Sequence, residues 1–225
     1  VYKFVSDSHA LENLRKRQLK ISKVTQTNDP FEMVPFTFKN LANRKRYLKV
    51  LESHTRNRGF IAFSKKHVSP SMWANYANDH KGLCLGFDTP KSEYFKQKAN
   101  TYLREVKYVP AYRNFNMDNF ETFDKNLLEG ELDYAMSTKS LHWEYEDEVR
   151  GFVGIPPDEQ SNEHWFIPYS DSLRLKEVIV GKDYAGDINE LRNVVNDASV
   201  NFFTASVSIT EFAIEKTPMP RMGSA

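Results

Sequence analysis

The order of strand-like and helix-like segments is the feature that most constrains how this chain can fold. Short apolar segments at 60–64, 83–87 and 175–181 have the length and composition of strands. Amphipathic segments typical of helices lie between or beside them, at 40–59, 69–82 and 187–198. Because strands and helices do not alternate strictly, a parallel doubly wound sheet is disfavoured. The sequence predicts an α+β fold with a split, mostly antiparallel sheet flanked by helices.

Further segments complete this predicted layout. Alternating residues predict strands at 103–109 and 205–215, and residues 117–137 are predicted to be mostly helical. The chain contains no internal repeat and no low-complexity linker. We therefore expect one domain over residues 1–215. Residues 216–225 are expected to form a C-terminal tail, whose last letters, MGSA, are typical of residues added during cloning.

Charge and cysteine content narrow the class of protein. The 31 basic and 30 acidic side chains nearly cancel, so the total charge does not indicate a nucleic-acid-binding protein. A local basic cluster at 44–49 remains, either as a solvated helix surface or as a patch facing phosphates. No apolar run approaches the roughly 18 residues of a membrane span, so no membrane association is expected. The single Cys84 excludes an internal disulfide and is compatible with a reducing, cytoplasmic location.

The stretch HWEYEDEVRGFV, residues 142–153, is the most unusual in charge pattern. Read as a strand over 142–152, it places Glu144, Glu146, Glu148 and Arg150 on one face, with neighbours about 6.6–7 Å apart. Three carboxylates at that spacing repel each other unless Arg150, a ligand or solvent balances them. Either this is a solvated sheet face with cross-strand ion pairs, or one glutamate faces a developing positive charge in a cleft.

Aromatic and turn residues elsewhere have two readings as well. Trp73 and Tyr76 lie three residues apart on one face of the 69–82 helix, where they either pack in the core or stack on a ligand. Asn28 lies in TNDPFE, where it favours a turn and is also able to donate to a ligand.

Several motifs, taken together, resemble one protein family. The segments VYKF, NDPFE, FS…MWANYANDHKGLCLGF, VKYV, K…WEYEDEVR and LKEVIVG occur in this order over about residues 1–215. In order and spacing they resemble the uncharacterised bacterial family known as domain of unknown function 2971, DUF2971. That family label implies no function.

The same landmarks more remotely resemble the ADP-ribosyltransferase fold, especially the toxins that modify DNA. In that resemblance VYKF is the first strand, FS with the following helix supports the nicotinamide ribose, and EYEDEVRGF is the late strand with the catalytic glutamate. Glu148 is then the catalytic residue, with Glu146 two positions earlier. The resemblance implies NAD as substrate and the following NAD-binding residues: Tyr2, Lys3, Asn28, Phe63, Ser64, Trp73, Tyr76 and Arg150.

Lys3 departs from the pattern of that fold. It stands where those proteins carry His or Arg, and a lysine is a point charge that neither stacks nor forks as arginine does. Lys3 therefore differs in chemistry from the residue that holds the adenosine side of NAD in that fold. Arg150 is expected either to pair with Glu148 or to reach a pyrophosphate with two hydrogen bonds.

These observations lead to one expected function and two alternatives. We expect an enzyme that cleaves NAD and transfers ADP-ribose to a macromolecule, nucleic acid or protein, in a bacterial toxin or phage-defence setting. The first alternative is a non-catalytic sensor of a nucleotide or phage component on the same fold. The second is a metal-dependent nuclease using the carboxylates of 144–148, which is disfavoured because one strand does not converge alternating side chains on one ion. No HExxH or CxxC motif occurs, so no metal site is expected.

Overall fold

A computed structural model describes residues 1–88, 102–115, 125–171 and 173–220. The helices in these ranges are α1 (Asp7–Arg15), α2 (Leu41–Thr55), α3 (Pro70–Tyr76), α5 (Lys125–Met136) and α6 (Ile188–Val195). Short 3-10 helices are η1 (Val24–Gln26), η3 (Leu141–Glu146) and η4 (Pro157–Glu159). Local sequence explains several starts: the Asn40 and Ser69 side chains accept hydrogen bonds from the first turns of α2 and α3.

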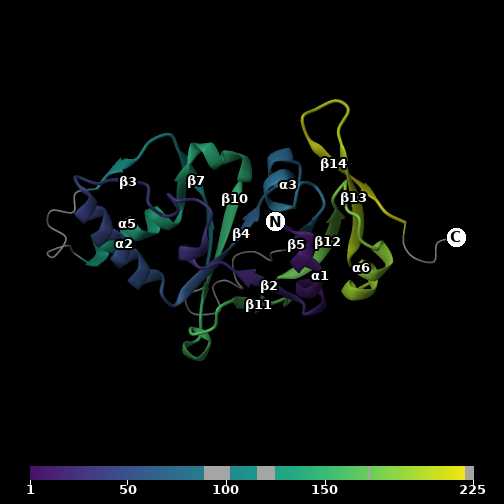
Figure 1. Ribbon diagram of the computed structural model, residues 1–225, viewed down its shortest axis with the longest axis horizontal. Coiled ribbons are helices and arrows are strands. Elements are labelled where there is room, and N and C mark those ends of the chain that lie inside the picture. The colour runs from purple at the N-terminus through teal and green to yellow at the C-terminus, as the bar shows by residue number, and fades with distance from the viewer. Residues whose placement is uncertain (89–101, 116–124, 172, 221–225) are drawn as a thin grey trace.

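The strands form one eight-stranded sheet and three two-stranded pairs (Figure 1). In spatial order, the large sheet consists of β14 (Ile214–Pro218), β13 (Asn201–Val207), β12 (Arg174–Val180), β5 (Leu83–Asp88), β1 (Tyr2–Val5), β4 (Arg58–Ser64), β10 (Glu148–Gly154) and β6 (Tyr102–Glu105). The pairs are β11 (Trp165–Pro168) with β2 (Gln18–Ile21), β3 (Phe36–Thr37) with β8 (Arg113–Asn114), and β7 (Lys107–Val109) with β9 (Thr138–Ser140). Among the strands that the structure describes in the large sheet, β12 and β13 run parallel and the other neighbouring pairs run antiparallel. The predicted α+β class, with a mostly antiparallel sheet flanked by helices, is confirmed.

The middle of the large sheet is loosely joined. β4 and β10 are in register over seven residue pairs, whereas β1 and β4 share the single pair Tyr2 and Ser64. Beyond that pair the Lys3 ammonium, rather than a β1 amide, donates to the Ala62 carbonyl oxygen at 3.0 Å. The side chain thus satisfies a backbone acceptor where the ladder between the two strands is interrupted. This interruption is where the candidate site lies.

Successive residues of β4 point to opposite faces of the sheet and join different parts of the core. Ile61 and Phe63 pack in a cluster with residues of α1, α6, β2 and β11, including Leu14 and Leu191. Phe60 packs in a second cluster with residues of α2 and α5. A third cluster lies under α3, around Trp73. The β1, β4 and β10 strands therefore lie near the middle of the long axis, with helices on both sides (Figure 1).

Three predicted elements differ from the structure. The predicted strand at 103–109 is two strands, β6 and β7, because the strand is interrupted at Val106. The Val106 amide donates to the Glu148 carbonyl oxygen. The predicted helix at 117–137 is seen as α5, and its residues 117–124 lie outside the described ranges. The predicted strand at 205–215 is a hairpin, since the Ser208 amide donates to the Ala213 carbonyl oxygen and closes a turn.

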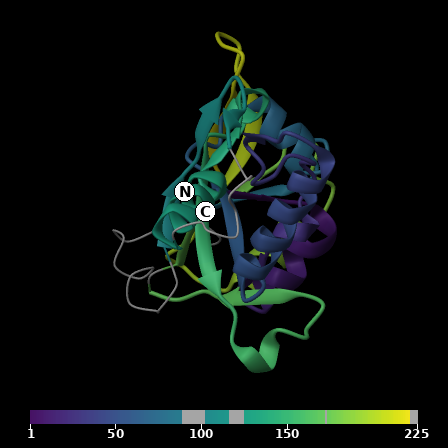
Figure 2. The same cartoon turned by 90° about the vertical axis from the view of Figure 1, so that its left-hand side faces the viewer.

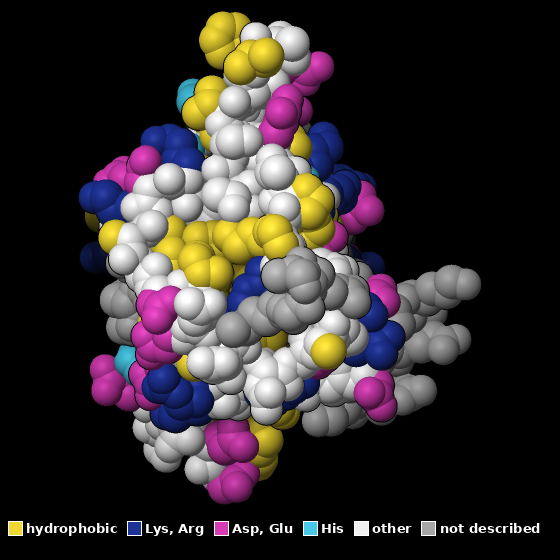
Figure 3. Space-filling view, turned by 90° about the vertical axis from the view of Figure 1, so that its right-hand side faces the viewer, with side chains coloured by type: hydrophobic (Ala, Val, Ile, Leu, Met, Phe, Trp, Pro, Cys, Tyr) yellow, Lys and Arg dark blue, Asp and Glu magenta, His cyan; other side chains and the backbone are white. Residues whose placement is uncertain are grey.

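The second strand of that hairpin, β14, continues to Pro218 and pairs with β13. Residues 216–218 of the expected tail are thus part of the sheet, and residues 221–225 lie outside the described ranges. The hairpin projects from the molecule and carries hydrophobic side chains at its end (Figure 3). Ile209 is 99% exposed and Phe212 is 105% exposed relative to reference values.

A second projection lies at the opposite end of the molecule. It is the segment between β10 and β11, which contains η4, and both ribbon views place it away from the β13–β14 hairpin (Figures 1 and 2). None of the helices in the described ranges has the length and apolar composition needed to cross a membrane.

Candidate functional site

The stretch 142–152 is not one strand, so the predicted row of three glutamates on one face is wrong. Residues up to Glu146 form η3, Asp147 adopts a left-handed conformation with φ of 44°, and β10 begins at Glu148. The Asp147 carbonyl oxygen accepts from the Lys65 amide at 2.9 Å, which fixes this reversal. As a result Glu144 is exposed, while Glu146 and Glu148 are buried.

Glu146 and Glu148 both line a cavity of about 270 Å³ in the interrupted region between β1 and β4. Five parts of the chain build its wall: β1, the segment that follows β2, β4, α3 and residues 139–148. The lining residues are Tyr2, Lys3, Phe4, Ser22, Gln26, Thr27, Asn28, Glu32, Phe60, Ala62, Phe63, Ser64, Met72, Tyr76, Lys139, Glu146 and Glu148.

The structure brings most of the sequence-predicted site residues into this cavity. Those that line it are Tyr2, Lys3, Asn28, Phe63, Ser64, Tyr76, Glu146 and Glu148. The sheet register explains part of this grouping, because Ser64 is paired with Tyr2 on one side and with Glu148 on the other.

Trp73 and Arg150 do not line the cavity. Trp73 is a core residue: it is fully buried, its indole nitrogen donates to the His67 carbonyl oxygen at 2.7 Å, and its ring packs edge-on against Phe4. Core packing, one of its two readings, therefore accounts for Trp73. Arg150 is 0% exposed and supports the cavity from behind.

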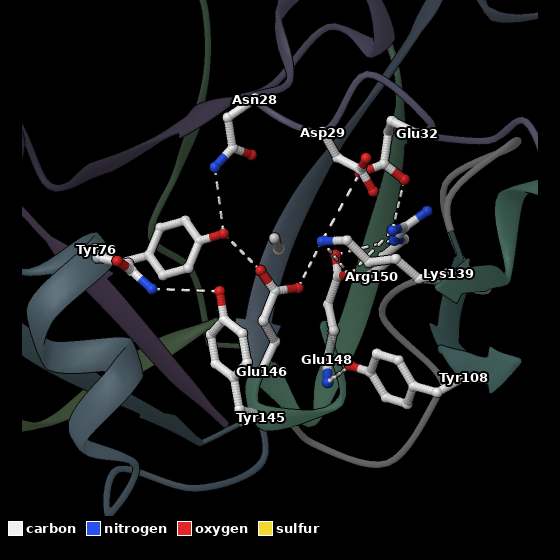
Figure 4. Close-up of polar contacts among 12 residues, drawn as sticks. Asn28, Asp29, Glu32, Tyr76, Tyr108, Lys139, Tyr145, Glu146, Glu148 and Arg150 are labelled. Atoms are coloured by element: carbon white, nitrogen blue, oxygen red, sulfur yellow. Dashed lines mark hydrogen bonds and ion pairs between the residues drawn. The ribbon is translucent and has the colours of Figure 1, made fainter. Parts of the chain in front are cut away.

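Arg150 holds the Glu148 carboxylate through both oxygens (Figure 4). Its Nε and Nη2 donate to Glu148 Oε1 and Oε2 at 2.9 and 3.0 Å, and Nη1 donates to the Met136 carbonyl oxygen at 3.0 Å. Arg150 Nη2 also lies 2.7 Å from Glu32 Oε1. With its guanidinium so engaged, Arg150 pairs with Glu148 rather than reaching for a pyrophosphate.

Lys139 and Tyr76 hold the second glutamate (Figure 4). The Lys139 ammonium donates to Glu146 Oε2 at 2.5 Å and lies 3.6 Å from Glu148 Oε2. The Tyr76 hydroxyl donates to Glu146 Oε1 at 2.5 Å, and the Asn28 amide donates to the Tyr76 oxygen at 3.4 Å. The two carboxylates are therefore linked through one lysine and fixed by separate partners.

Burial and charge act against each other in setting the protonation states of this cluster. Burial alone would raise the pKa of Glu148, but the two hydrogen bonds and the charge of Arg150, with the charges of Lys139 and Lys3, hold it below its ordinary value. Burial lowers the pKa of Lys3, while Glu148 and Glu146 act in the opposite direction. Glu148 is thus an ionised carboxylate at neutral pH.

Sequence reasoning missed two members of the cluster, Glu32 and Lys139. Glu32 is the last residue of NDPFE, and Lys139 is the lysine of K…WEYEDEVR, so both lay in motifs that already pointed to the family. Tyr108 of VKYV also reaches the site, where its hydroxyl accepts from the Glu148 amide at 2.8 Å. The signal that could have found them was the presence of charged or phenolic side chains in every such motif.

The carboxylates of this region are balanced by side chains of the protein. Lys139 lies among Glu32, Glu146 and Glu148, and Arg150 lies between Glu32 and Glu148. Across the described ranges no three His, Cys, Asp or Glu side chains are arranged to hold a metal ion. Because two cations already occupy the space among the glutamates, the arrangement disfavours the metal-dependent nuclease.

One family model matches a segment of the chain that contains part of this site. Residues 72–151 match the family model described as "Protein of unknown function (DUF2971)". Over this segment the chain is similar to the DUF2971 family. The predicted family is thereby confirmed over 72–151, a shorter span than the motifs suggested. The DUF2971 segment contains Tyr76, Lys139, Glu146, Glu148 and Arg150.

No curated protein and no solved structure matches this chain. The likeness to ADP-ribosyltransferases therefore stays a prediction, and the site must be interpreted from its own geometry.

Proposed function

We propose that this protein is an ADP-ribosyltransferase-like enzyme that cleaves NAD between nicotinamide and ribose. The observation that carries the proposal is the position of Glu148, which lines a cavity while Arg150 fixes both of its oxygens. A carboxylate that is already ionised and oriented stabilises positive charge developing on a ribose without further reorganisation. The toxin or phage-defence setting expected from the sequence belongs to the same proposal.

The proposed reaction is a substitution at ribose C1′, which needs no oxidant or reductant. The bond between ribose C1′ and the nicotinamide nitrogen breaks, and nicotinamide leaves with the bonding electron pair, which neutralises its ring. A nucleophilic oxygen or nitrogen of the acceptor forms the new bond to C1′. Its proton passes to Glu146 or Glu148 as general base and then to solvent.

The remaining lining residues support the binding of one end of a dinucleotide. The aromatic rings of Tyr2, Phe63 and Tyr76 offer surfaces on which a nicotinamide ring can stack. At about 270 Å³ the cavity is slightly below the roughly 300–1,000 Å³ usual for small-ligand sites. It therefore suits nicotinamide with its ribose, with the rest of NAD outside it.

Release of nicotinamide tests the proposal. Purified protein is incubated with NAD, with and without a cell lysate as acceptor, and compared with Glu148→Gln and with Glu144→Gln. Glu144 is exposed and so serves as a matched control in the same segment. We expect release by the wild type and by Glu144→Gln and its loss in Glu148→Gln. Equal release by all three would contradict the assigned role of Glu148.

A second candidate, a non-catalytic nucleotide sensor, is favoured by one observation. Both oxygens of each glutamate already accept a hydrogen bond from the chain itself, those of Glu148 from Arg150 and those of Glu146 from Lys139 and Tyr76. A ligand would then bind beside a closed network. NAD-induced stabilisation without nicotinamide release would support this sensor in place of the enzyme.

A further inference from the structure

A second hollow, separate from the cavity of Glu148, is lined mainly by basic and polar side chains. Its volume is about 450 Å³, and its lining residues are Lys23, Val24, Lys49, Glu52, Ser53, Thr55, Arg56, Arg58, Gln160 and Trp165. Four of these side chains are basic and one is acidic. The chain as a whole carries a formal charge of only +1, so this local excess of positive charge is not a general property of the surface.

The basic side chains of this hollow have no acidic partner among the residues that the structure describes. Within the described ranges no carboxylate lies within 4.0 Å of the charged nitrogens of Lys23, Lys49, Arg56 or Arg58. Many basic side chains elsewhere are paired, as Lys16 is with Glu12 at 2.7 Å. A hollow lined by unpaired charge of one sign concentrates counter-ions from solution.

Two of the cations are held in place by neutral groups. The Lys23 ammonium donates to the Asn162 carbonyl oxygen at 2.9 Å and lies 4.2 Å from the centre of the Trp165 ring. Arg58 Nη1 lies 3.3 Å from His54 Nε2. Burial, together with Arg58, lowers the pKa of His54, so this histidine offers a neutral partner at pH 7 and leaves the positive charge uncompensated.

The positive charge continues along α2. Lys45, Lys49 and Arg56 are separated by four and seven residues and therefore lie on one face of the helix, which retains helical geometry at its C-cap Arg56. At 1.5 Å per residue the line from Lys45 to Arg56 extends about 16 Å. We call Lys23, Lys45, Lys49, Arg56 and Arg58 the α2 basic track. A line of that length suits a chain of phosphates better than a single phosphate group.

The α2 basic track is next to the candidate active site. Ser22 and the residues 26–28 line the Glu148 cavity, whereas Lys23 and Val24 line the basic hollow. One short segment of chain thus has one site on each side. A polymer bound along the track would pass close to the cavity.

We propose that the α2 basic track binds the phosphate backbone of a nucleic acid. Its further role, presenting that nucleic acid as the acceptor of ADP-ribose, rests on the proposed function. A membrane is disfavoured because the fully exposed side chains Ile209 and Phe212, which would insert into lipid, belong to the turn between β13 and β14. Both ribbon views place that hairpin away from α2 (Figures 1 and 2).

Fluorescence anisotropy with labelled oligonucleotides tests the track directly. The probes are a single-stranded DNA, an RNA of the same sequence and the DNA duplex, each titrated at several salt concentrations. The variant is Lys49→Gln with Arg56→Gln. The matched control is Lys81→Gln with Arg174→Gln, which removes the same charge from two exposed side chains outside the hollow.

We expect the wild type and the control to bind at least one probe, with affinity falling as salt rises. The track variant should bind roughly tenfold more weakly, and its slope of log K against log salt should be shallower by about 0.7 per lost contact on a single strand. Equal weakening in variant and control would overturn the inference, because it would indicate unspecific charge attraction. Absence of binding to every probe at low salt, or binding only to phosphatidylserine vesicles, would overturn it as well.

NAD provides the second readout that separates the two proposals. NAD-induced thermal stabilisation should be unchanged in the track variant, because the substituted residues lie outside the Glu148 cavity. Nucleic-acid binding at the track with no NAD cleavage by the wild type would contradict the proposed function and the acceptor role, and it would leave the binding surface established. NAD cleavage by a protein that binds no nucleic acid would support the proposed function and would contradict both the nucleic-acid-binding track and its acceptor role.

Discussion

Arg150 and Glu148 lie two residues apart on β10 and form a doubly hydrogen-bonded ion pair with almost no access to solvent. The distances are 2.9 Å for Nε to Oε1 and 3.0 Å for Nη2 to Oε2. Arg150 is 0% exposed and Glu148 is 3% exposed. Because they share one strand, the pair can form only where β10 is regular, and the left-handed Asp147 marks where that regularity begins.

Replacing Arg150 should destabilise the protein strongly. Arg150→Met leaves Glu148 and Glu32 without their shared cation in a buried place, and breaking a buried ion pair from one side costs about 3–5 kcal/mol. Urea denaturation followed by circular dichroism measures the change. Lys16→Met, which breaks an exposed pair on α1, should cost less than about 1 kcal/mol. Similar losses for the two variants would contradict a structural role for the buried pair.

Acid stability should depend on Glu148. Its folded pKa is below the ordinary value of 4.5, so its contribution to stability is fully present above that pH and is lost as pH falls through the folded pKa. Glu148→Gln should therefore be less stable at neutral pH and lose less stability on acidification. Unfolding midpoints measured from about pH 6 to about pH 3 give both values.

Two comparisons sharpen that measurement. Burial raises the pKa of Glu32, so Glu32 acts in the opposite direction and must be kept unchanged in every variant. Glu144→Gln removes an exposed carboxylate and should leave the acid limb as in the wild type. If Glu148→Gln and the wild type lose stability in parallel below pH 4.5, the charge of Glu148 is not stabilised by folding.

Tyr76 should position Glu146. Tyr76→Phe keeps the ring but removes the hydroxyl that donates to the Glu146 carboxylate, which should cost about 1.5–3 kcal/mol in stability. Nicotinamide release should fall more than this loss of folded protein explains, because Glu146 then has only Lys139 to orient it. Tyr145→Phe is the control, since the Tyr145 hydroxyl accepts from Asn75. Equal release by both variants would show that Glu146 needs no orientation by Tyr76.

The membership of the cavity could be predicted from the sequence better than its local geometry. Tyr2, Ser64, Glu146 and Glu148 all line it, and they came from quoted motifs together with a remote resemblance. The error concerned 142–152, where alternating charge resembled a strand. A 3-10 helix followed by one left-handed residue also brings Glu146 and Glu148 to one side, and periodicity alone does not distinguish the two arrangements.

Long-range contacts explain what could not be predicted. Lys139 lies in β9, which pairs with β7, a strand 31 residues earlier in the chain. Nothing local indicates that its ammonium meets Glu146. The burial of Arg150 likewise depends on Glu32, which is far away in the sequence. In the same way, the break at Val106 follows from its amide bonding to Glu148 of another strand.

Two glycines offer a test of the backbone that supports β1. A Cβ added at Gly82 would lie 2.2 Å from the Val5 carbonyl oxygen and 3.0 Å from that of Ala77, and both are backbone atoms with little freedom to move. Gly82→Ala should therefore destabilise the protein by about 1–3 kcal/mol or more. Since Val5 pairs with Leu83 in the sheet, the strain should also reach β1 and weaken NAD-induced stabilisation.

Gly130 provides a matched substitution with the opposite expected effect on stability. It lies within α5, and an added Cβ would meet nothing within 4 Å. Gly130→Ala should stabilise the protein by roughly 1 kcal/mol, the difference in helix propensity between the two residues. Urea denaturation of both variants, with NAD thermal shifts on each, separates strain at β1 from a general effect of adding a methyl group. Loss of stability in Gly130→Ala, or tolerance of Gly82→Ala, would show that the close approach of Val5 and Gly82 does not control this part of the sheet.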